Sequence, residues 1–255
     1  MRVGVIGIGV VGKPLYESLK YYHGSENVTA YDKYKPYDKW EDILKTDICF
    51  ICLPTDGGED GRLDVSVVDD TVNKLFKDGY NGLLVIKSTL RLGYISELIK
   101  RYQDKHIAVF PEWLYADNAF PDTIKPEMTV IGVPNTLNNY ASMILEACPW
   151  HHKSQYHIVL CEEAVMIKLT ANALASTKIS FANQIGIVCE KYDIDKDKVM
   201  NAIKTDPRCA PRYLNPTGEP YGGYCLPKDT KELAYATDKG DLLKAVDKFN
   251  EGLKK

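Results

Sequence analysis

The chain has 255 residues, of which 45% are hydrophobic and 26% charged, and its formal net charge is -3. These values are ordinary for a soluble globular protein with one large domain or two smaller ones. The charge balance forces no basic face for nucleic acid, no apolar run reaches membrane-spanning length, and the N-terminus lacks a secretory pattern. We therefore expect a cytoplasmic protein that binds neither nucleic acid nor a membrane.

The first part of the chain alternates short apolar runs with amphipathic segments. Strands are predicted at RVGVIG, NVTAYD, ICFICLP, LLVIKST, HIAVFPE, MTVIGV and YHIVLCE. Apolar residues recur at helical spacing in VVGKPLYESLKYY, VSVVDDTVNKLFKD, YISELIKRYQ and TLNNYASMILEA. Because strands that alternate with helices form crossover units, residues 1–160 are predicted to form a Rossmann-type, doubly wound parallel sheet with helices on both faces.

From about Glu162 the pattern becomes helical. EEAVMIKLTANALASTKISFANQIGIVCEKY keeps apolar residues at helical spacing over many turns. A shorter helix at KDKVMNAIKTD and one or two terminal helices are predicted after it. The predicted fold class is therefore α/β, with the sheet followed by a helical domain, residues 161–255, built on one long central helix.

A glycine-rich turn follows the first predicted strand. Gly7, Gly9 and Gly12 form G-x-G-x-x-G before a helix, where glycines permit a tight turn and let a pyrophosphate approach the backbone. Asp32 ends the second strand, where a carboxylate can bond ribose hydroxyls. Because this charge repels the additional phosphate of NADP, and Lys33 offsets it only in part, the expected cofactor is NAD.

Polar side chains also end two later strands. Ser88 and Thr89 close LLVIKST, and Glu112 follows HIAVFP. Ligands of open parallel sheets bind at this carboxyl edge, although any one of these side chains could be a simple cap. The predicted cofactor site comprises Gly7, Gly9, Val10, Val11, Gly12, Asp32, Pro54, Thr55, Ser88 and Thr89.

One cysteine has an unusual local context, EPYGGYCLPKDTKEL. Cys225 follows Gly222 and Gly223 and precedes a predicted helix start, with Pro227 at the first helical position. A thiol beside a helix N-terminus and Lys228 tends toward the thiolate, so Cys225 is a candidate nucleophile.

Two polar residues share one face of the predicted long helix, because Lys168 and Asn172 are four positions apart. A lysine on an apolar helix is often a surface residue whose stem covers its neighbours. Beside a nicotinamide, the same pair is a candidate for binding an oxyanion.

The remaining cysteines and histidines predict no further chemistry. An odd number of scattered cysteines, seven, is typical of reduced thiols, and the Cys49/Cys52 pair lies within a predicted buried strand. The histidines of WHHKSQYH have no cysteine or carboxylate at a ligand spacing, so no metal is predicted.

In chain order, GIGVVG, CLPT with a downstream GRLD, KST, PEWL, KLTANA, DPR and GGYCLPKDT resemble the UDP-glucose/GDP-mannose dehydrogenase family, from residue 1 to about residue 250. The resemblance implies a metal-free oxidoreductase that oxidises the C6 alcohol of a nucleotide sugar to a carboxylate with two NAD molecules. The Lys228-Asp229 pair resembles the UDP-glucose and GDP-mannose branches more than the N-acetylhexosamine branch. The expected substrate is UDP-glucose, with UDP-glucuronate for polysaccharide biosynthesis as the product.

The resemblance also implies residue roles. Cys225 would attack the intermediate aldehyde, giving a thiohemiacetal and then a thioester. Lys168 and Asn172 would polarise the C6 oxygen, Asp229 would position water, and Glu112 and Thr89 would assist proton movement and thioester hydrolysis. Arg208 would reach the substrate of a neighbouring subunit, which implies a homodimer built on the long helix. The implied substrate residues are Glu112, Trp113, Leu114, Lys168, Asn172, Arg208, Tyr221, Gly222, Gly223 and Cys225.

The chain departs from the family pattern in three places. Tyr115, Ala116 and Asp117 follow PEWL where the family has a charged residue, Glu and Gly, and Asp56 replaces a proline. Full-length members carry a third domain that closes over the UDP, whereas this chain stops at Lys255. We interpret it as a natural short form without that domain, as an artificially shortened piece of a longer protein, or as one part of a split enzyme whose UDP-binding domain is a separate chain.

Two alternatives remain open. A β-hydroxyacid dehydrogenase-like enzyme shares the Rossmann domain, the helical domain and the Lys-x-x-x-Asn pair, but it performs one oxidation without a cysteine. The other alternative is a truncated NAD-binding protein without independent activity.

Overall fold

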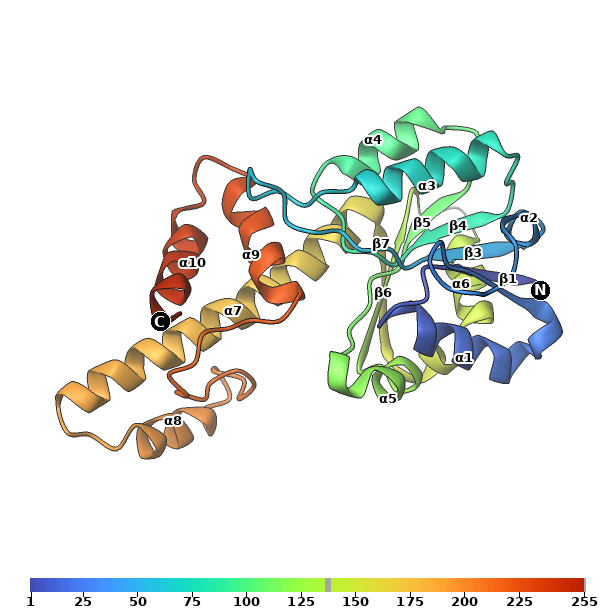
Figure 1. Cartoon of the computed structure of the whole chain (residues 1–255). Helices are drawn as coiled ribbons and strands as arrows, with labels where there is room; N and C mark the ends of the chain where they lie inside the picture. Colours follow the sequence, from blue (N-terminus) through green and yellow to red (C-terminus); the bar gives the residue numbers. More distant parts are fainter. Residues whose placement is uncertain (136–138, 255) are drawn as a thin grey trace. The chain divides into compact units, whose positions relative to one another are not determined.

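The computed structural model describes residues 1–135 and 139–254 (Figure 1). The chain divides into two compact units. The first consists of Met1–Thr55 and Asp64–Met166, and the second of Asp56–Leu63 and Ile167–Lys255. The chain therefore leaves the first unit after Thr55, returns to it at Asp64 and leaves it again after Met166.

The first unit contains a mixed sheet in which all seven predicted strands are present. In chain order these are β1 (Val3–Ile6), β2 (Val28–Tyr31), β3 (Ile48–Ile51), β4 (Leu83–Ile86), β5 (Ile107–Val109), β6 (Met128–Val133) and β7 (Gln155–Leu160). Their spatial order is β2-β1-β3-β4-β5-β6-β7. The predicted α/β fold is thus confirmed.

The direction of the last two strands differs from the expected parallel arrangement. β1 to β5 are mutually parallel, but β6 pairs with β5 in antiparallel fashion, Val109 opposite Gly132, and β7 is parallel to β6. The connection from β5 to β6 holds a 3-10 helix of three residues (Ala116–Asn118) and α5 (Ala119–Ile124), a helix of six residues. A parallel crossover usually contains a full helix along the sheet, which these short helices do not provide, and β6 runs back from the edge where β5 ends.

Helices cover both faces of this sheet (Figure 1). One face carries α1 (Gly12–His23) and α6 (Tyr140–Ala147), and the other carries α3 (Ser66–Lys77) and α4 (Tyr94–Arg101). The short α2 (Trp40–Ile43) precedes β3. Part of the helix predicted at TLNNYASMILEA falls on residues 136–138, outside the described residues.

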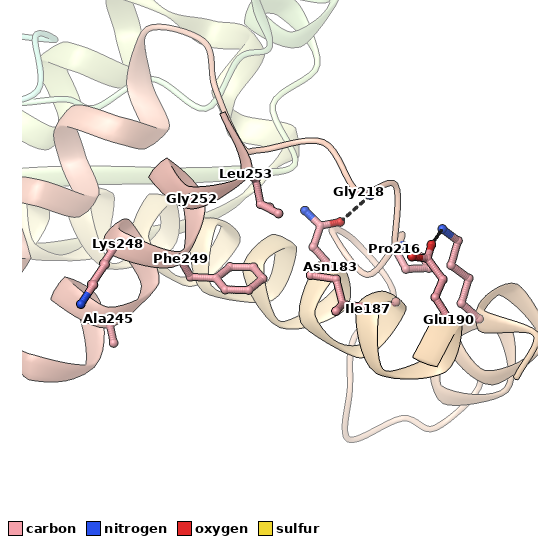
Figure 2. Close-up of a pocket in the computed structure, with 12 residues that line it drawn as sticks. Asn183, Ile187, Glu190, Pro216, Gly218, Ala245, Lys248, Phe249, Gly252 and Leu253 are labelled. Carbon is pink, nitrogen blue, oxygen red and sulfur yellow. Dashed lines mark hydrogen bonds and ion pairs between the residues drawn. The ribbon is translucent and has the colours of Figure 1, made fainter. Parts of the chain in front are cut away.

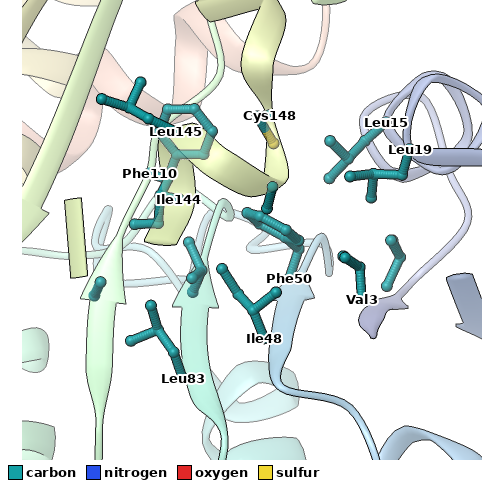
Figure 3. Close-up of a cluster of buried hydrophobic side chains, with 14 of the residues drawn as sticks. Val3, Leu15, Leu19, Ile48, Phe50, Leu83, Phe110, Ile144, Leu145 and Cys148 are labelled. Atoms are coloured by element: carbon teal, nitrogen blue, oxygen red, sulfur yellow. The ribbon is translucent and has the colours of Figure 1, made fainter. Parts of the chain in front are cut away.

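A buried apolar cluster joins the sheet to α1 and α6 (Figure 3). Leu15 and Leu19 of α1 and Ile144 of α6 belong to this cluster, in which the rings of Phe50 and Phe110 are 6.4 Å apart between centroids. The central strands are buried on both faces, which explains why their sequences are continuous apolar runs and not alternating ones. This packing fixes the start of α1 at the carboxyl end of β1.

The second unit is built on α7 (Cys161–Lys191), whose first six residues belong to the first unit. It is followed by α8 (Lys196–Lys204), α9 (Cys225–Tyr235) and α10 (Asp241–Leu253). The predicted long central helix and the shorter helices after it are therefore present. Within the described residues, none of the helices combines the length and apolar character that crossing a bilayer requires.

The start of α9 lies two residues earlier than predicted. Cys225 is itself the first helical residue and Pro227 is the third, so the expectation of Pro227 at the first position was wrong. Proline is tolerated here because the amide groups of a first helical turn have no acceptor within the helix. Cys225 consequently occupies the helix N-terminus itself.

His151 is a buried polar residue on the core of the first unit. Its Nδ1 lies 2.6 Å from Thr129 Oγ1, and its ring lies 4.8 Å from that of Phe110. Burial, with smaller contributions from the charges of Lys87 and His152, lowers the pKa of His151 to about 3. An unfolded chain would take up a proton near pH 6.5, so the native state loses stability as the pH falls through that value.

We predict that replacing His151 by glutamine removes part of the acid sensitivity of the first unit. Between pH 7 and pH 5, the protonation of unfolded His151 should cost the wild type about 2 kcal/mol of unfolding free energy that the variant does not lose. Urea unfolding followed by tryptophan fluorescence measures this, because Trp40, Trp113 and Trp150 all lie in the first unit. His157→Gln, at an exposed position, is the control. Equal pH sensitivity in His151→Gln and wild type would contradict the assignment.

Candidate active site

The glycine-rich turn after β1 contains two kinds of glycine. Gly7 has a φ of 87°, and a Cβ there would lie 2.5 Å from the carbonyl oxygen of Cys52. A Cβ on Gly12 would lie 1.8 Å from the carbonyl oxygen of Gly7. Gly9 is exposed, and a Cβ there would meet nothing within 4 Å. The fold thus requires Gly7 and Gly12, whereas Gly9 leaves an open surface above the turn.

The N-terminus of α1 borders this open surface. Its N-cap residue, Val11, provides no side-chain hydrogen bond, and the first turn of α1 holds no acidic residue. Val10 is 57% exposed, so the turn is accessible. Amide groups at a helix start that lack a side-chain acceptor, together with the helix dipole, form a binding site for an anionic group such as a pyrophosphate.

Asp32 is hydrogen-bonded to the same turn. One carboxylate oxygen accepts from the amide of Ile8 at 2.9 Å and the other from the amide of Tyr34 at 2.9 Å. Each carboxylate oxygen has a second lone pair, so these bonds leave acceptor capacity for ribose hydroxyls. The cation beside Asp32 is Lys35, 3.9 Å away, and not Lys33 as the sequence suggested. Lys35 also donates to the carbonyl of Ile8 and so helps to close the turn.

Two hydroxyl groups join the carboxyl ends of β3 and β4. Ser88 donates to the carbonyl of Leu53 at 2.7 Å and accepts from its amide at 2.9 Å. Thr55 donates to the carbonyl of Thr89 at 2.7 Å. Ser88 and Thr55 are almost fully buried, so these hydroxyls hold the edge at which Pro54 and Thr89 lie. Their contact with a cofactor stays a prediction.

The segment after β5 contains Glu112 and a lysine that sequence reasoning did not select. Glu112 is buried and accepts the amide of Leu114 at 2.8 Å. Glu112, Trp113 and Leu114 line a small cavity of about 20 Å³ together with Lys87. The ammonium of Lys87 is buried, donates to the carbonyl of Phe110 at 3.2 Å and lies 3.8 Å from that ring's centroid. The one sequence signal for it was a lysine at the end of an otherwise apolar strand.

In the second unit, the predicted residues of α7 and α9 meet around Asp229. This carboxylate is fully buried. It accepts the Asn172 amide at 2.6 Å and the Lys228 ammonium at 2.8 Å. Lys168 lies one turn before Asn172 on α7 and is also buried. The structure therefore brings together Asn172 and Asp229, which are 57 residues apart in the sequence.

Cys225 differs from most of the other cysteines in its surroundings. It is partly exposed and begins α9, one turn before Asp229. By contrast, burial raises the pKa of Cys52, Cys148 and Cys161 to about 12 in each case and that of Cys49 further still. The position at a helix N-terminus favours the thiolate at Cys225.

The remaining predicted sugar-site residues have different environments. Tyr221 is buried, and its amide and carbonyl are both bonded to the Asn250 side chain, at 2.7 and 3.0 Å. Gly223, with a φ of 72°, continues an exposed turn toward Cys225. Arg208 is exposed and pairs with Asp206. Their roles toward a sugar stay predictions.

A larger cavity of about 750 Å³ lies elsewhere in the second unit (Figure 2). Phe249 and Leu253 project from α10 toward α7, whose residues Asn183 and Ile187 also line the cavity. No predicted sugar-site residue is among its lining residues. Across the described residues, no cluster of three or more histidine, cysteine or acidic side chains is arranged to hold a metal ion.

Comparison with known proteins identifies the family. Residues 25–147 match the model of the UDP-glucose/GDP-mannose dehydrogenase family, NAD binding domain, and residues 162–252 match the central domain of the same family. The chain belongs to the UDP-glucose/GDP-mannose dehydrogenase family. Its members are NAD-dependent nucleotide-sugar dehydrogenases, and the match to their NAD binding domain confirms NAD as the cofactor.

Individual relatives give the same family. The chain is 26% identical to UDP-glucose 6-dehydrogenase of Campylobacter jejuni, over 84% of this chain and 55% of the relative. It is 28% identical to GDP-mannose 6-dehydrogenase of Pseudomonas aeruginosa, over 78% and 49%. The solved UDP-glucose dehydrogenase structure of Pyrobaculum islandicum superposes with a TM-score of 0.83 at 24% identity, covering 98% of this chain and 68% of that one. The chain thus spans about half the length of these two curated relatives.

The two kinds of glycine lead to a prediction for NAD binding. Gly9→Ala should leave the melting temperature unchanged, because its methyl group meets no protein atom. It should weaken NAD binding about tenfold or more, because a methyl above the turn displaces a phosphate from charge-assisted hydrogen bonds worth about 1.5–3 kcal/mol. Calorimetry with NAD and a thermal melt measure both effects.

Gly12→Ala is the matched control for the fold. Its methyl group clashes with the carbonyl of Gly7, so this variant should lose thermal stability as well as NAD binding. A Gly9→Ala variant that binds NAD as tightly as the wild type would refute the placement of the phosphates at this turn.

Proposed function

We propose that this protein is an NAD-dependent nucleotide-sugar 6-dehydrogenase that converts UDP-glucose to UDP-glucuronate through a thioester on Cys225. The observation that supports it most is the position of Cys225 at the start of α9, one turn before the buried contact of Asp229 with Asn172 and Lys228. The family match and a relative named UDP-glucose 6-dehydrogenase support the reaction class and the choice of sugar.

In the first oxidation, the C6 alcohol loses a proton from its oxygen and a hydride from C6, which gives the aldehyde. NAD supplies the chemistry of both oxidations by accepting one hydride in each. We propose that Lys168 and Asn172 bind the C6 oxygen as it becomes an oxyanion. Asn172 is suited to this role because its amide has two N–H donors and Asp229 occupies one of them.

In the second oxidation, the Cys225 thiolate adds to the C6 aldehyde and forms a thiohemiacetal. Loss of a second hydride from C6 gives a thioester, and water attacks its carbonyl to release the carboxylate and regenerate the thiolate. We propose that Asp229 positions this water, and that Glu112 and Thr89 assist proton movement and hydrolysis. The buried Asp229 carboxylate carries a compensating ammonium at 2.8 Å, so the pair adds no uncompensated charge beside the thiol.

We also propose a homodimer that packs along α7. Leu174, Phe181 and Val188 are 58%, 52% and 45% exposed and lie seven residues apart. Large apolar side chains at this spacing lie on one stripe of a helix and favour helix pairing. Arg208, exposed in the same unit, is then available to a partner's substrate.

The cysteine mechanism predicts that Cys225→Ala abolishes the formation of UDP-glucuronate from UDP-glucose and NAD, while NAD affinity is retained. Iodoacetamide should modify Cys225 of the wild type before the other six cysteines, because the thiolate is the reactive form. Mass spectrometry of the labelled peptides measures this. Cys209→Ala, which removes another partly exposed thiol, should behave as the wild type. Acid production by Cys225→Ala, or a faster rate with GDP-mannose than with UDP-glucose, would count against the proposal.

The dimer proposal predicts that Phe181→Glu yields a monomer. A carboxylate in the centre of an apolar helix pair would be buried without a partner, which is strongly unfavourable. Light scattering coupled to size exclusion measures the mass. Val67→Glu, at a comparably exposed apolar position of the first unit, should remain a dimer. A monomeric wild type would contradict the proposed dimer.

A further inference from the structure

The segment after β3 packs with the helical unit although the chain on both sides of it belongs to the sheet unit. Residues 56–63 form a closed turn in which Gly57 and Leu63 pair as an antiparallel bridge. The amide of Gly58 donates to the carbonyl of Arg62 at 2.6 Å, and the amide of Arg62 to Asp60 Oδ1 at 2.9 Å. These hydrogen bonds across the turn hold residues 56–63 in a compact conformation.

This turn is seated directly on α9. Gly61 has a φ of 77°, and a Cβ there would lie 2.6 Å from the ring of Tyr235. Position 61 therefore accepts only glycine, both for its backbone conformation and for its distance to the ring. The turn contacts the last residue of α9 at this point.

An ion pair fastens the turn to the middle of α9. Glu232 is fully buried and accepts from Arg62 Nε at 3.0 Å, from Arg62 Nη2 at 2.8 Å and from the amide of Leu63 at 2.8 Å. The two guanidinium bonds are a bidentate pairing, which fixes orientation as well as distance. Because a buried carboxylate is tolerated only with such donors, α9 and the turn are held in one arrangement.

Glu232 lies on the face of α9 that carries the reactive group. Cys225, Asp229 and Glu232 occupy positions i, i+4 and i+7 of the helix, so their side chains share one stripe. The first turn of α9 has no side-chain cap. Contacts further along the helix also hold α9, among them the bond from Asn172 to Asp229 and the Arg62–Glu232 pair.

The other end of the turn is held at the predicted cofactor edge. Thr55, the residue before Asp56, donates to the carbonyl of Thr89, and Asp64, the residue after Leu63, accepts the amide of Ser66 at the start of α3. The closed turn is covalently continuous with these residues and belongs, with α9, to the second unit. Through this continuity, a displacement of the Pro54–Thr55 backbone by bound NAD would reach the turn and the helix that begins at Cys225.

We propose that Arg62 and Glu232 are positioning residues through which bound NAD alters the reactivity of Cys225. This inference rests on the proposed function, in which Cys225 is the nucleophile and Pro54 and Thr55 border the cofactor. A coupling between two sites changes affinity or reactivity at one when the other is occupied, typically by about 5-fold or more. The Arg62–Glu232 pair is then required for that change.

The test is the rate of Cys225 alkylation by iodoacetamide with and without saturating NAD. In the wild type, NAD should change this rate by about 5-fold or more. In Arg62→Met, NAD should still bind by calorimetry, but the two rates should agree within about twofold. Direct shielding of the thiol by the cofactor would survive the substitution, so an unchanged NAD effect in Arg62→Met, or none in the wild type, would overturn the proposal.

Two further variants make the result specific. Arg101→Met breaks the ion pair with Asp69 in the first unit and should keep the wild-type NAD effect. Arg62→Lys keeps the charge but cannot form both bonds to Glu232, so an intermediate effect is expected, and this variant decides the question if Arg62→Met does not fold. If Cys225 is not labelled before the other cysteines, the proposed function fails. If it is labelled first but without dependence on NAD, only the coupling fails.

Discussion

The helical unit depends on the buried carboxylate of Asp229. With no exposed surface, this charge is stable only because Lys228 and Asn172 donate to it at 2.8 and 2.6 Å. Removing one partner of such a buried pair commonly costs about 3–5 kcal/mol, whereas the intact pair adds little net stability. The arrangement therefore serves specificity more than stability, because it holds α9 against α7 in one register. Thr230 and Ser176, both fully buried and 2.8 Å apart, repeat the contact one residue further along α9.

The buried Asp229 carboxylate also affects Asn172 and Cys225, the side chains that the proposed mechanism uses. Asn172 has one amide N–H bound to Asp229 and a second that is geometrically distinct, so its orientation is set before a substrate arrives. Cys225 sits one helical turn away at a helix N-terminus, where the helix dipole favours its thiolate. A packed polar core thus holds the side chains that the proposed mechanism uses.

In the sheet unit, close contacts between backbone segments hold the elements together, as the buried Asp229 carboxylate does in the helical unit. Gly12 is in contact with the carbonyl of Gly7, and Gly7 with that of Cys52, so β1, β3 and α1 meet at distances that no side chain would permit. Asp32 and Lys35 then bind the amide and the carbonyl of Ile8 and close the turn. The turn is consequently a rigid product of packing, and Gly9 and Val10 are exposed on it.

Strands, helices and the glycine-rich turn could be predicted from the sequence, because each is encoded by residues close together in the chain. Strands buried on both faces are continuous apolar runs, the α7 helix has helical periodicity over many turns, and the glycine spacing after β1 is specific for close backbone approach. These properties arise from residues within one element or one turn. They also led us to select Gly7, Gly9, Gly12 and Asp32 for the cofactor, an assignment that stays a prediction.

Strand direction and the burial of charged residues could be read only from the tertiary structure, because a local pattern carries no information on a partner far away in the chain. Strand direction is one example: MTVIGV is apolar whichever way it runs, and only the structure shows that β6 is antiparallel to β5. Glu232 is another, since an acidic residue in a helix appears solvent-exposed until Arg62, 170 residues earlier, is placed beside it. Burial of a charge is a property of two segments together, and folding alone brings them into contact.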